Sequence, residues 1–215
     1  MKVVEIFKSI DGEGKRAGLP TTFIRLYGCN IKCSYCDSQY ACVGGEYKDM
    51  TVDEIMSAVK HLGVNSITIT GGEPLIHKEL PDLIVALNFE EFDINIETNG
   101  TIDIGNILTI FNNVWFTVDY KCKSSNMSDM MDENIFKEQL RPKDVLKFVV
   151  GSDEDLNQAL EVIEKYNPCC HIYFSPVFGF EPSKIVDFLL EKRLHHCKVQ
   201  LQMHKYIWDK DKRGV

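Results

Sequence analysis

Three cysteines lie close together in the N-terminal part of this 215-residue chain, at positions suited to a metal centre. Cys29 and Cys33 are separated by three residues, and Cys33 and Cys36 by two. Eight residues are cysteine, so roughly 1% of chains of this composition would show the spacing by chance. Uncoordinated thiols in a polar loop are readily oxidised, so the motif favours a metal ion or an iron–sulfur cluster.

The number of thiols in the motif bears on which centre it holds. Structural zinc takes four protein ligands, and the fourth here would have to be Cys42, Asp37 or a distant histidine. A fully ligated [4Fe–4S] cluster also takes four cysteines. Three cysteines leave one iron open to a small molecule such as S-adenosylmethionine, which can then accept an electron. The motif favours a catalytic cluster, with structural zinc and coincidence as the alternatives.

Apolar segments rich in β-branched and aromatic residues alternate along the chain with segments of helical periodicity. Strands are predicted at Val3–Phe7, Thr22–Tyr27, Ser66–Thr70, Asp93–Glu97, Val114–Val118, Val145–Val150, His171–Phe174 and Lys198–Leu201. Helix start signals occur at Thr51, Pro81, Ser152 and Pro182. The alternation predicts βαβ units, and hence one α/β domain over residues 1–215 with a mainly parallel sheet, open or curled into a barrel.

The loops that follow the predicted strands carry most of the polar motifs. Strands of a parallel sheet open their carboxyl ends on one edge, where ligands bind. These loops hold Gly28-Cys29, Gly71–Pro74, Thr98–Gly100, Asp119–Lys121, Gly151-Ser152, Ser175-Pro176 and Gln202–Lys205. Turn chemistry explains any one of them, but seven together favour a site. Arg25, inside an apolar strand, needs a buried anion, and a ligand carboxylate is favoured over an internal salt bridge.

The composition and net charge of the chain disfavour several classes of protein. A net charge of −8 disfavours long nucleic acid as a partner, and no apolar run is long enough to span a membrane. No signal peptide is recognisable, so a cytoplasmic protein with free thiols is expected. The acidic run at 153–155 is expected to be a solvated helix N-terminus. Five cysteines are expected to be buried apolar residues: Cys42, Cys122, Cys169, Cys170 and Cys197.

The three-cysteine motif, followed by Gly71-Gly72-Glu73-Pro74, resembles the radical S-adenosylmethionine superfamily. That resemblance implies a partial (β/α) barrel of about six parallel strands with short N- and C-terminal extensions. Segments 9–14, 23–26, 36–38, 97–100 and 202–205 resemble more specifically the 7-carboxy-7-deazaguanine synthase family. The resemblance implies conversion of 6-carboxy-5,6,7,8-tetrahydropterin to 7-carboxy-7-deazaguanine with loss of ammonia, on the route to queuosine.

The same resemblance assigns a role to each matching residue. Cys29, Cys33 and Cys36 would ligate a [4Fe–4S] cluster, and Ser38 would contact Mg²⁺. S-adenosylmethionine would be bound by Tyr35, Cys36, Asp37, Gly72, Glu73, Asp119, Tyr120, Lys121, Ser175, Pro176, Val177 and Phe178. The pterin would contact Ile10, Asp11, Gly12, Glu13, Arg25, Thr70 and His204. A pterin presents ring N–H groups and a carboxylate, which suit the side chains of Glu13 and Arg25.

The resemblance also implies partners. The radical belongs to the cofactor, so no side chain is expected to be catalytic. A flavodoxin or ferredoxin-type protein would reduce the cluster, and the chain would form a homodimer. Two other functions stay open from the sequence: a different radical S-adenosylmethionine enzyme, such as a glycyl-radical activase acting on a protein loop, and a non-catalytic zinc-binding module.

Overall fold

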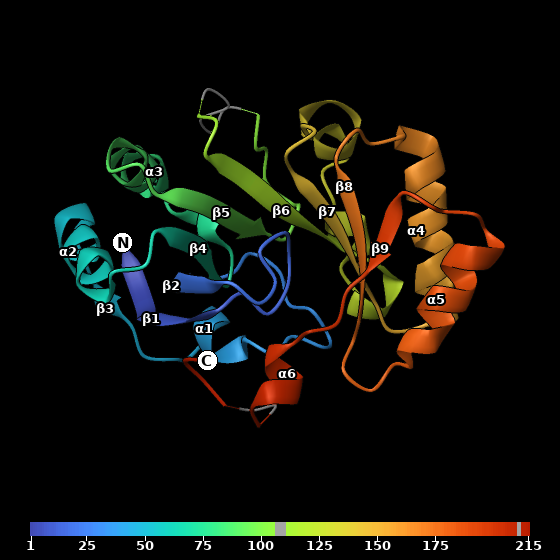
Figure 1. The fold of residues 1–215 in the computed structure, drawn as a ribbon, viewed down its shortest axis with the longest axis horizontal. Coiled ribbons are helices and arrows are strands. Elements are labelled where there is room, and N and C mark those ends of the chain that lie inside the picture. The colour runs from blue at the N-terminus through green and yellow to red at the C-terminus, as the bar shows by residue number, and fades with distance from the viewer. Residues whose placement is uncertain (106–110, 210–211) are drawn as a thin grey trace.

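The computed structural model describes residues 1–105, 111–209 and 212–215, which form an α/β fold around one curved sheet (Figure 1). In the described residues the sheet has nine strands in the order β3-β1-β2-β4-β5-β6-β7-β8-β9. Their bounds are β1 Lys2–Ile10, β2 Pro20–Leu26, β3 Lys48–Asp49, β4 Ser66–Gly71, β5 Asp93–Thr98, β6 Val114–Lys121, β7 Val145–Val150, β8 His171–Pro176 and β9 Cys197–Val199. β1 is antiparallel to β2 and β3, and each neighbouring pair from β2 to β9 is parallel.

The predicted parallel α/β fold is confirmed, with differences at its ends. Seven strands are parallel rather than about six, because the short β9 extends the sheet beyond β8. β9 begins one residue before the predicted segment and ends two residues earlier. β3 is a two-residue strand with no sequence signal. β3 and β9 stand at opposite ends of the strand order, so the curved sheet is open and does not close into a full barrel.

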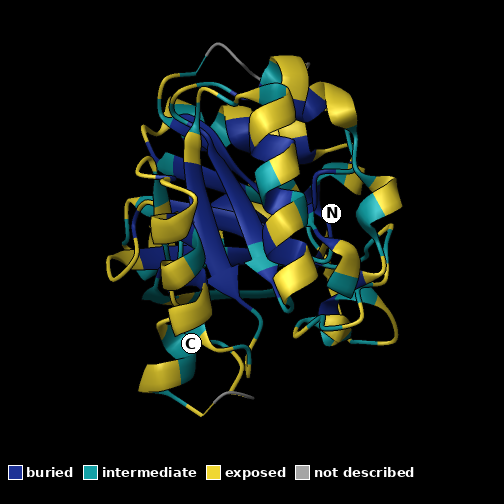
Figure 2. Ribbon diagram, turned by 90° about the vertical axis from the view of Figure 1, so that its right-hand side faces the viewer, coloured by how far each residue is buried: buried dark blue, intermediate teal, exposed yellow. Residues whose placement is uncertain are grey.

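Four longer helices cover the outer side of the sheet (Figure 1): α2 Val52–Leu62, α3 Leu80–Phe89, α4 Asp153–Tyr166 and α5 Pro182–Glu191. Thr51 and Glu54 form the predicted capping box, and the Ser152 hydroxyl accepts from the Asp155 N–H at 3.2 Å. Figure 2, viewed from the side of α4 and α5, shows exposed residues on the outward faces of the helices and buried residues along the strands. Shorter turns lie at α1 Gln39–Cys42, α6 His204–Ile207, Pro74–Ile76, Lys123–Ser125, Ser128–Met130 and Ile135–Gln139.

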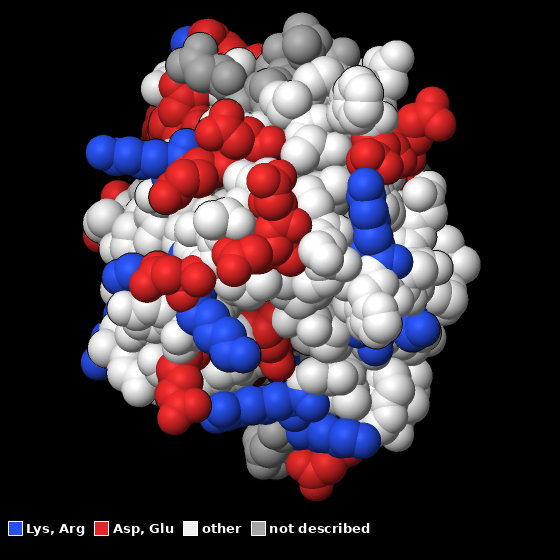
Figure 3. Space-filling model, turned by 90° about the vertical axis from the view of Figure 1, so that its left-hand side faces the viewer, with Lys and Arg blue, Asp and Glu red and all other residues white. Residues whose placement is uncertain are grey.

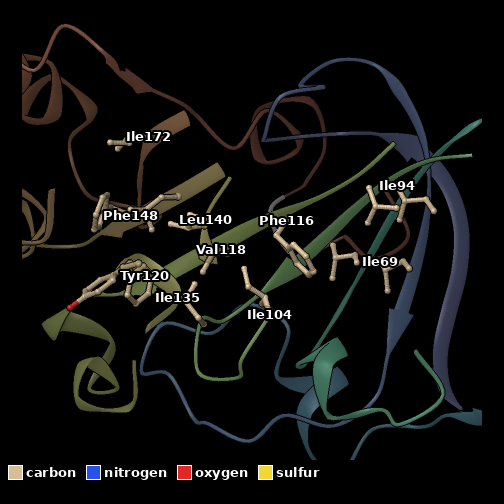
Figure 4. Packing of buried hydrophobic residues seen from close by; sticks show 14 of the residues in the cluster. Ile69, Ile94, Ile104, Phe116, Val118, Tyr120, Ile135, Leu140, Phe148 and Ile172 are labelled. Carbon is tan, nitrogen blue, oxygen red and sulfur yellow. The ribbon is translucent and has the colours of Figure 1, made fainter. Parts of the chain in front are cut away.

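Alternation along the strands gives the sheet two different faces. The face under the helices is apolar and holds most of the core, including Ile24, Leu26, Ile67, Ile69, Ile94, Ile96, Phe116, Val118, Leu146, Phe148, Ile172 and Phe174 (Figure 4). The register aligns the alternate residues of neighbouring strands on the inner face: Arg25, Thr68, Thr70, Asn95, Glu97, Thr117, Asp119, Lys121, Lys147 and Ser175. The inner face is therefore polar, as a ligand-binding surface requires.

Residues 11–19 fill the inner face at the amino ends of the strands. The Arg16 guanidinium donates to Asp11 Oδ2 at 2.9 Å, to Thr68 Oγ1 at 2.8 Å and to the Ile67 carbonyl at 2.9 Å. Arg16 also lies over the ring of Trp115. With this end occupied, the carboxyl ends of the strands are left as the side from which a ligand reaches the inner face.

The face that carries α2 and α3 intersperses acidic and basic side chains (Figure 3). This distribution accords with the acidic net charge of −8. In the residues that the structure describes, no helix has the length and apolar character needed to cross a bilayer.

Candidate functional site

The three motif cysteines lie in the loop between β2 and α1, at the carboxyl edge of the sheet. All three are half-buried and free of disulfides. The loop is fixed at its start by the Gly28 N–H, which donates to the Ala41 carbonyl at 2.7 Å. In its middle, the Ser34 N–H donates to the Ser125 carbonyl at 3.0 Å. The loop is therefore anchored to two separate segments and not left as a free excursion.

The chemistry of these thiols fits an iron–sulfur cluster, which needs deprotonated sulfur. A hydrogen bond with the Cys42 thiol lowers the pKa of Cys29 to about 6 and that of Cys36 to about 7. Burial raises the pKa of Cys33. Two of the three sulfurs are thus readily ionised near neutral pH. In the described part of the chain, no three His, Cys, Asp or Glu side chains converge on a single metal ion, but a cluster takes one thiolate on each of several irons and does not need that convergence.

Four of the five remaining cysteines differ from the prediction that they are buried apolar residues, because Cys42, Cys170 and Cys197 are half-buried and Cys169 is exposed. Cys42 is half-buried beside the motif, where its single S–H lies within hydrogen-bonding reach of the Cys29 and Cys36 sulfurs and of the Ser38 carbonyl, the last at 3.5 Å. Helix α1 brings it there, at one of the positions where the sequence allows a fourth zinc ligand. Cys122 is fully buried as expected.

Gly72 follows β4 and approaches the thiol loop so closely that no side chain fits. A Cβ at Gly72 would lie 2.1 Å from the Gly28 carbonyl oxygen and 2.9 Å from Cys29 Cβ. The Gly72 N–H donates to the Leu26 carbonyl at 3.1 Å, and the Glu73 N–H donates to the Gly28 carbonyl at 2.8 Å. The Gly-Gly-Glu-Pro segment and the thiol loop are therefore one packed unit.

Glu73 ties this unit to the loop after β5. The side chain is fully buried, and its Oε1 accepts from the Leu75 N–H at 3.0 Å and from Thr98 Oγ1 at 2.9 Å. Its Oε2 accepts from the Asn99 N–H at 2.7 Å. Burial raises the pKa of Glu73 to about 7 against these hydrogen bonds. Asn99 in turn donates to Cys29 Sγ at 3.7 Å, so two predicted loops meet at one thiol.

A charged cluster occupies the inner face beside these loops. Lys147, on β7, lies 3.2 Å from Glu13 Oε2 and 3.0 Å from Asp119 Oδ1, and Lys121 lies 3.0 Å from Asp119 Oδ2. Gln202 donates to Glu13 Oε2 at 3.4 Å. In the described residues the other carboxylate oxygen, Glu13 Oε1, is buried without a hydrogen-bond partner. That oxygen is an acceptor available to a ligand.

Two residues of this charged cluster, Lys147 and Glu97, are not among the site residues predicted from the sequence. Lys147 is 5% exposed and stands alone as a charge in the apolar segment Val145–Val150, which is the same signal that singled out Arg25. Glu97 was noted only as part of a motif. Burial raises the pKa of Glu97 to about 7, while the charge of Lys147 lowers it. A search for charged residues within the predicted strands would have identified both Lys147 and Glu97.

The C-terminal segment closes one side of the site. His204 packs on Gly12, where a Cβ would lie 2.2 Å from His204 Nδ1, and the Met203 N–H donates to the Gly12 carbonyl at 3.0 Å. Burial lowers the pKa of His204. Lys205 pairs with Asp37 at 2.8 Å, and Ser38 donates to Asp37 Oδ1 at 3.2 Å. The structure thus brings His204 to the predicted Gly12–Glu13 segment, and places Asp37 and Ser38 beside it.

Three predicted contact residues have other partners. The Asp11 carboxylate is buried and accepts from Arg16, Thr21 and Thr68, so it holds its own loop in place. Arg25 Nε donates to Glu5 Oε1 at 2.7 Å, which is the internal salt bridge that the sequence disfavoured. Tyr120 points away from the inner face because side chains alternate along β6. Its ring packs on Phe136 and Phe148 (Figure 4).

The remaining predicted residues lie at the edge of the same site. Tyr35 reaches the Val149 carbonyl at 3.5 Å, and burial raises the pKa of its phenol. Ser175 is buried at the end of β8, and in the described residues its hydroxyl has no partner. Pro176 is buried, Val177 is half-buried, and Phe178 is exposed. Ile10 is half-buried at the end of β1, and Thr70 is buried on the inner face.

Asp155 corrects the prediction of a solvated acidic helix start. It is fully buried in the first turn of α4, where Oδ1 accepts from the Ser124 N–H at 2.9 Å and Oδ2 from the Gly151 N–H at 2.8 Å. The Ser124 hydroxyl also donates to it. Ser124 accepts through its carbonyl from the Ser34 hydroxyl, so Asp155 supports the segment against which the thiol loop rests.

Comparison with known proteins accords with this geometry. The model of the radical SAM superfamily matches residues 23–167. In fold, the chain superposes on the crystal structure of QueE from Escherichia coli with a TM-score of 0.76 at 23% identity over 94% of both chains. It also superposes on Streptococcus suis SuiB bound to precursor peptide SuiA, with a TM-score of 0.62 at 13% identity over 83% of this chain and 48% of that one. The chain belongs to the radical SAM superfamily and has its fold.

Full-length relatives narrow the assignment. A 7-carboxy-7-deazaguanine synthase of Clostridium acetobutylicum is 43% identical over 219 aligned positions, covering 100% of this chain and 99% of the relative. One of Methanospirillum hungatei is 38% identical over 96% of this chain and 85% of the relative. The chain belongs to the 7-carboxy-7-deazaguanine synthase family, as the sequence motifs predicted.

Proposed function

We propose that the protein is a 7-carboxy-7-deazaguanine synthase that converts 6-carboxy-5,6,7,8-tetrahydropterin to 7-carboxy-7-deazaguanine with loss of ammonia. Family membership favours this activity over a glycyl-radical activase and over a zinc-binding module. One observation in the structure carries the proposal: an anchored loop of three free thiols lies at the carboxyl edge of the sheet, the side from which a ligand reaches the inner face that holds Glu13, whose buried Oε1 is unpartnered within the described residues. A redox cofactor and a polar ring can meet at that edge.

Cys29, Cys33 and Cys36 would hold a [4Fe–4S] cluster, which together with S-adenosylmethionine supplies the one-electron chemistry that starts the reaction. Gly72 gives its backbone close approach to the thiol loop, where a methionine group can be received. The Ser175 hydroxyl and the Asp119 carboxylate, both buried on the inner face, are polar groups suited to a ribose. Val177 and Phe178 offer apolar surface for an adenine at the edge of the site.

The pterin is proposed to lie against the inner face. Glu13 Oε1 would accept from ring N–H groups while Lys147 and Gln202 hold Oε2 in place. Glu5 engages Nε of Arg25, which in the described part of the chain leaves the Nη groups for the substrate carboxylate. His204 closes the site over Gly12 and excludes water from that side. Asp11 acts indirectly, because it fixes the loop that carries Glu13.

A divalent ion and protein partners complete the proposal. Ser38 offers a hydroxyl oxygen beside the Asp37 carboxylate, and hard oxygen ligands suit Mg²⁺. We propose a cytoplasmic homodimer, reduced by a flavodoxin or ferredoxin-type protein. The eight free cysteines support a reducing compartment.

The proposal is tested by anaerobic turnover of the reconstituted protein with S-adenosylmethionine, the carboxylated tetrahydropterin, Mg²⁺ and a chemical reductant. We expect 7-carboxy-7-deazaguanine, identified by mass spectrometry, together with 5′-deoxyadenosine and ammonia. Omitting the pterin is the control for uncoupled cofactor cleavage. A protein that carries an intact cluster and cleaves S-adenosylmethionine, yet makes no deazaguanine, would refute the assignment.

A further inference from the structure

Lys147 stands between two parts of the site that come from distant segments. Its ammonium lies 3.2 Å from Glu13 Oε2, in the loop after β1, and 3.0 Å from Asp119 Oδ1, near the end of β6. The register of β6 and β7 places Lys147 directly beside Asp119. One buried side chain therefore contacts both the residue proposed to bind the pterin and a residue proposed to bind the cofactor.

Stabilisation of the fold does not by itself explain the charged groups around Lys147. A buried ammonium pays a desolvation cost that ion pairing only repays when the geometry is good, and an apolar residue at such a site often stabilises a fold as well. Here the neighbours are three carboxyl groups, Glu13, Glu97 and Asp119, and a second ammonium, Lys121. The three carboxyl groups outnumber the two ammonium groups, so the carboxyl groups compete for hydrogen bonds from the Lys147 ammonium.

We propose that Lys147 is a positioning residue that couples the pterin pocket to the S-adenosylmethionine pocket, an inference that rests on the proposed function. Ring N–H groups that bind Glu13 would neutralise part of its charge and weaken its hold on Lys147. Lys147 then bonds more strongly to Asp119 and fixes that carboxylate in place. Occupancy of the pterin pocket thereby tightens binding of the cofactor, and linkage requires the reverse effect to have equal size.

The test is equilibrium binding to the cluster-reconstituted protein under anaerobic conditions without a reductant, so that no turnover occurs. S-adenosylmethionine is titrated by calorimetry with and without the carboxylated tetrahydropterin. In the wild type we expect the pterin to tighten cofactor binding at least about 5-fold, within the usual range of coupling between sites. Lys147→Met keeps an unbranched apolar stem but removes the terminal ammonium and its charge, so the ratio of the two dissociation constants should fall to within about 2-fold of one.

Two further variants separate positioning from a general structural role. Lys147→Arg retains the charge and should recover coupling of more than about 2-fold. Lys198→Met makes the matched change at the exposed β9 residue, which packs on Tyr173 and forms no ion pair with Glu13 or Asp119. It should keep the wild-type ratio. A wild-type ratio of one, or an unchanged ratio in Lys147→Met, overturns the coupling role.

A reciprocal pair of variants covers the case in which Lys147→Met fails to fold. In the absence of the second ligand, Glu13→Gln should tighten S-adenosylmethionine binding and Asp119→Asn should tighten pterin binding, although each residue is assigned to the other ligand, because each change removes one competitor for Lys147. If neither variant affects the other ligand, the inference fails. Turnover of the wild type distinguishes the two proposals: deazaguanine formation with unchanged coupling in the variants overturns the role of Lys147 alone, whereas no deazaguanine overturns the proposed function and this inference with it.

Discussion

Replacing Gly72 by alanine should separate the Gly-Gly-Glu-Pro segment from the thiol loop. The new Cβ would lie 2.1 Å from the Gly28 carbonyl oxygen, whereas an ordinary contact begins at 3.4 Å, so one backbone segment must move by 3.4 − 2.1 = 1.3 Å. Overpacking of this kind costs about 1–3 kcal/mol. The movement also stretches the bonds from Gly72 N–H to Leu26 and from Glu73 N–H to Gly28, each worth about 1 kcal/mol.

These terms together give a loss of about 3–5 kcal/mol in the unfolding free energy of the apoprotein. For a chain of this size that corresponds to a fall of about 6–20 °C in Tm. Differential scanning calorimetry measures the shift, and iron content after reconstitution measures whether the thiol loop still holds its cluster. Gly105→Ala is the control, because its Cβ would meet only side-chain atoms, at 3.1–3.3 Å. A Tm for Gly72→Ala equal to that of Gly105→Ala would refute the packing argument.

Three further changes test separate parts of the site. Asp155→Ala leaves the Ser124 and Gly151 N–H groups without their acceptor and should lower the free energy of unfolding in urea by about 2–4 kcal/mol. The control Asp153→Ala, at an exposed residue, should lower it by less than about 0.5 kcal/mol. Equal losses in the two variants would contradict this prediction. Burial raises the pKa of Glu97 to about 7 from 4.5, so folding takes up a proton between these values, and wild-type apoprotein should lose stability as pH rises through this window. Glu97→Gln should flatten that fall, and superimposable pH profiles would disprove the assignment. Cys33→Ala should lose most of the bound iron and sulfide, while the exposed Cys169→Ala keeps them; equal iron in both would exclude Cys33 as a ligand.

Much of the fold follows from patterns within single segments. The strand from Asp93 and the helix that begins after Thr51 are specified by alternation, β-branched residues and a capping box, all of which act over a few residues. The end of the sheet was harder to place because β9 has three residues, too few for a clear period. The thiol motif was visible for the same local reason, since its spacing lies within eight residues.

The partners of charged residues could not be read from the sequence. Asp11 and Arg16 are five residues apart, but the buried space that makes them pair is created by Thr68 on another strand. Asp155 looked like a solvated acid because its first-turn position favours negative charge on any exposed helix. Its burial depends on Ser124, which lies 31 residues away. Pairing at such separations is decided by the tertiary fold.

The sheet has one polar and one apolar face, and this division affects which substitutions members of the family can accept. Adjacent residues of a strand point to opposite faces of the sheet. A substitution at Lys147 therefore changes the inner, ligand-binding face, while its neighbours Leu146 and Phe148 continue to pack under the helices. New ligand preferences can therefore arise by single replacements without rebuilding the scaffold. The same arrangement is intolerant of insertions: one added residue within β7 would drive the ammonium among hydrocarbon side chains and turn a phenyl ring toward the ligand.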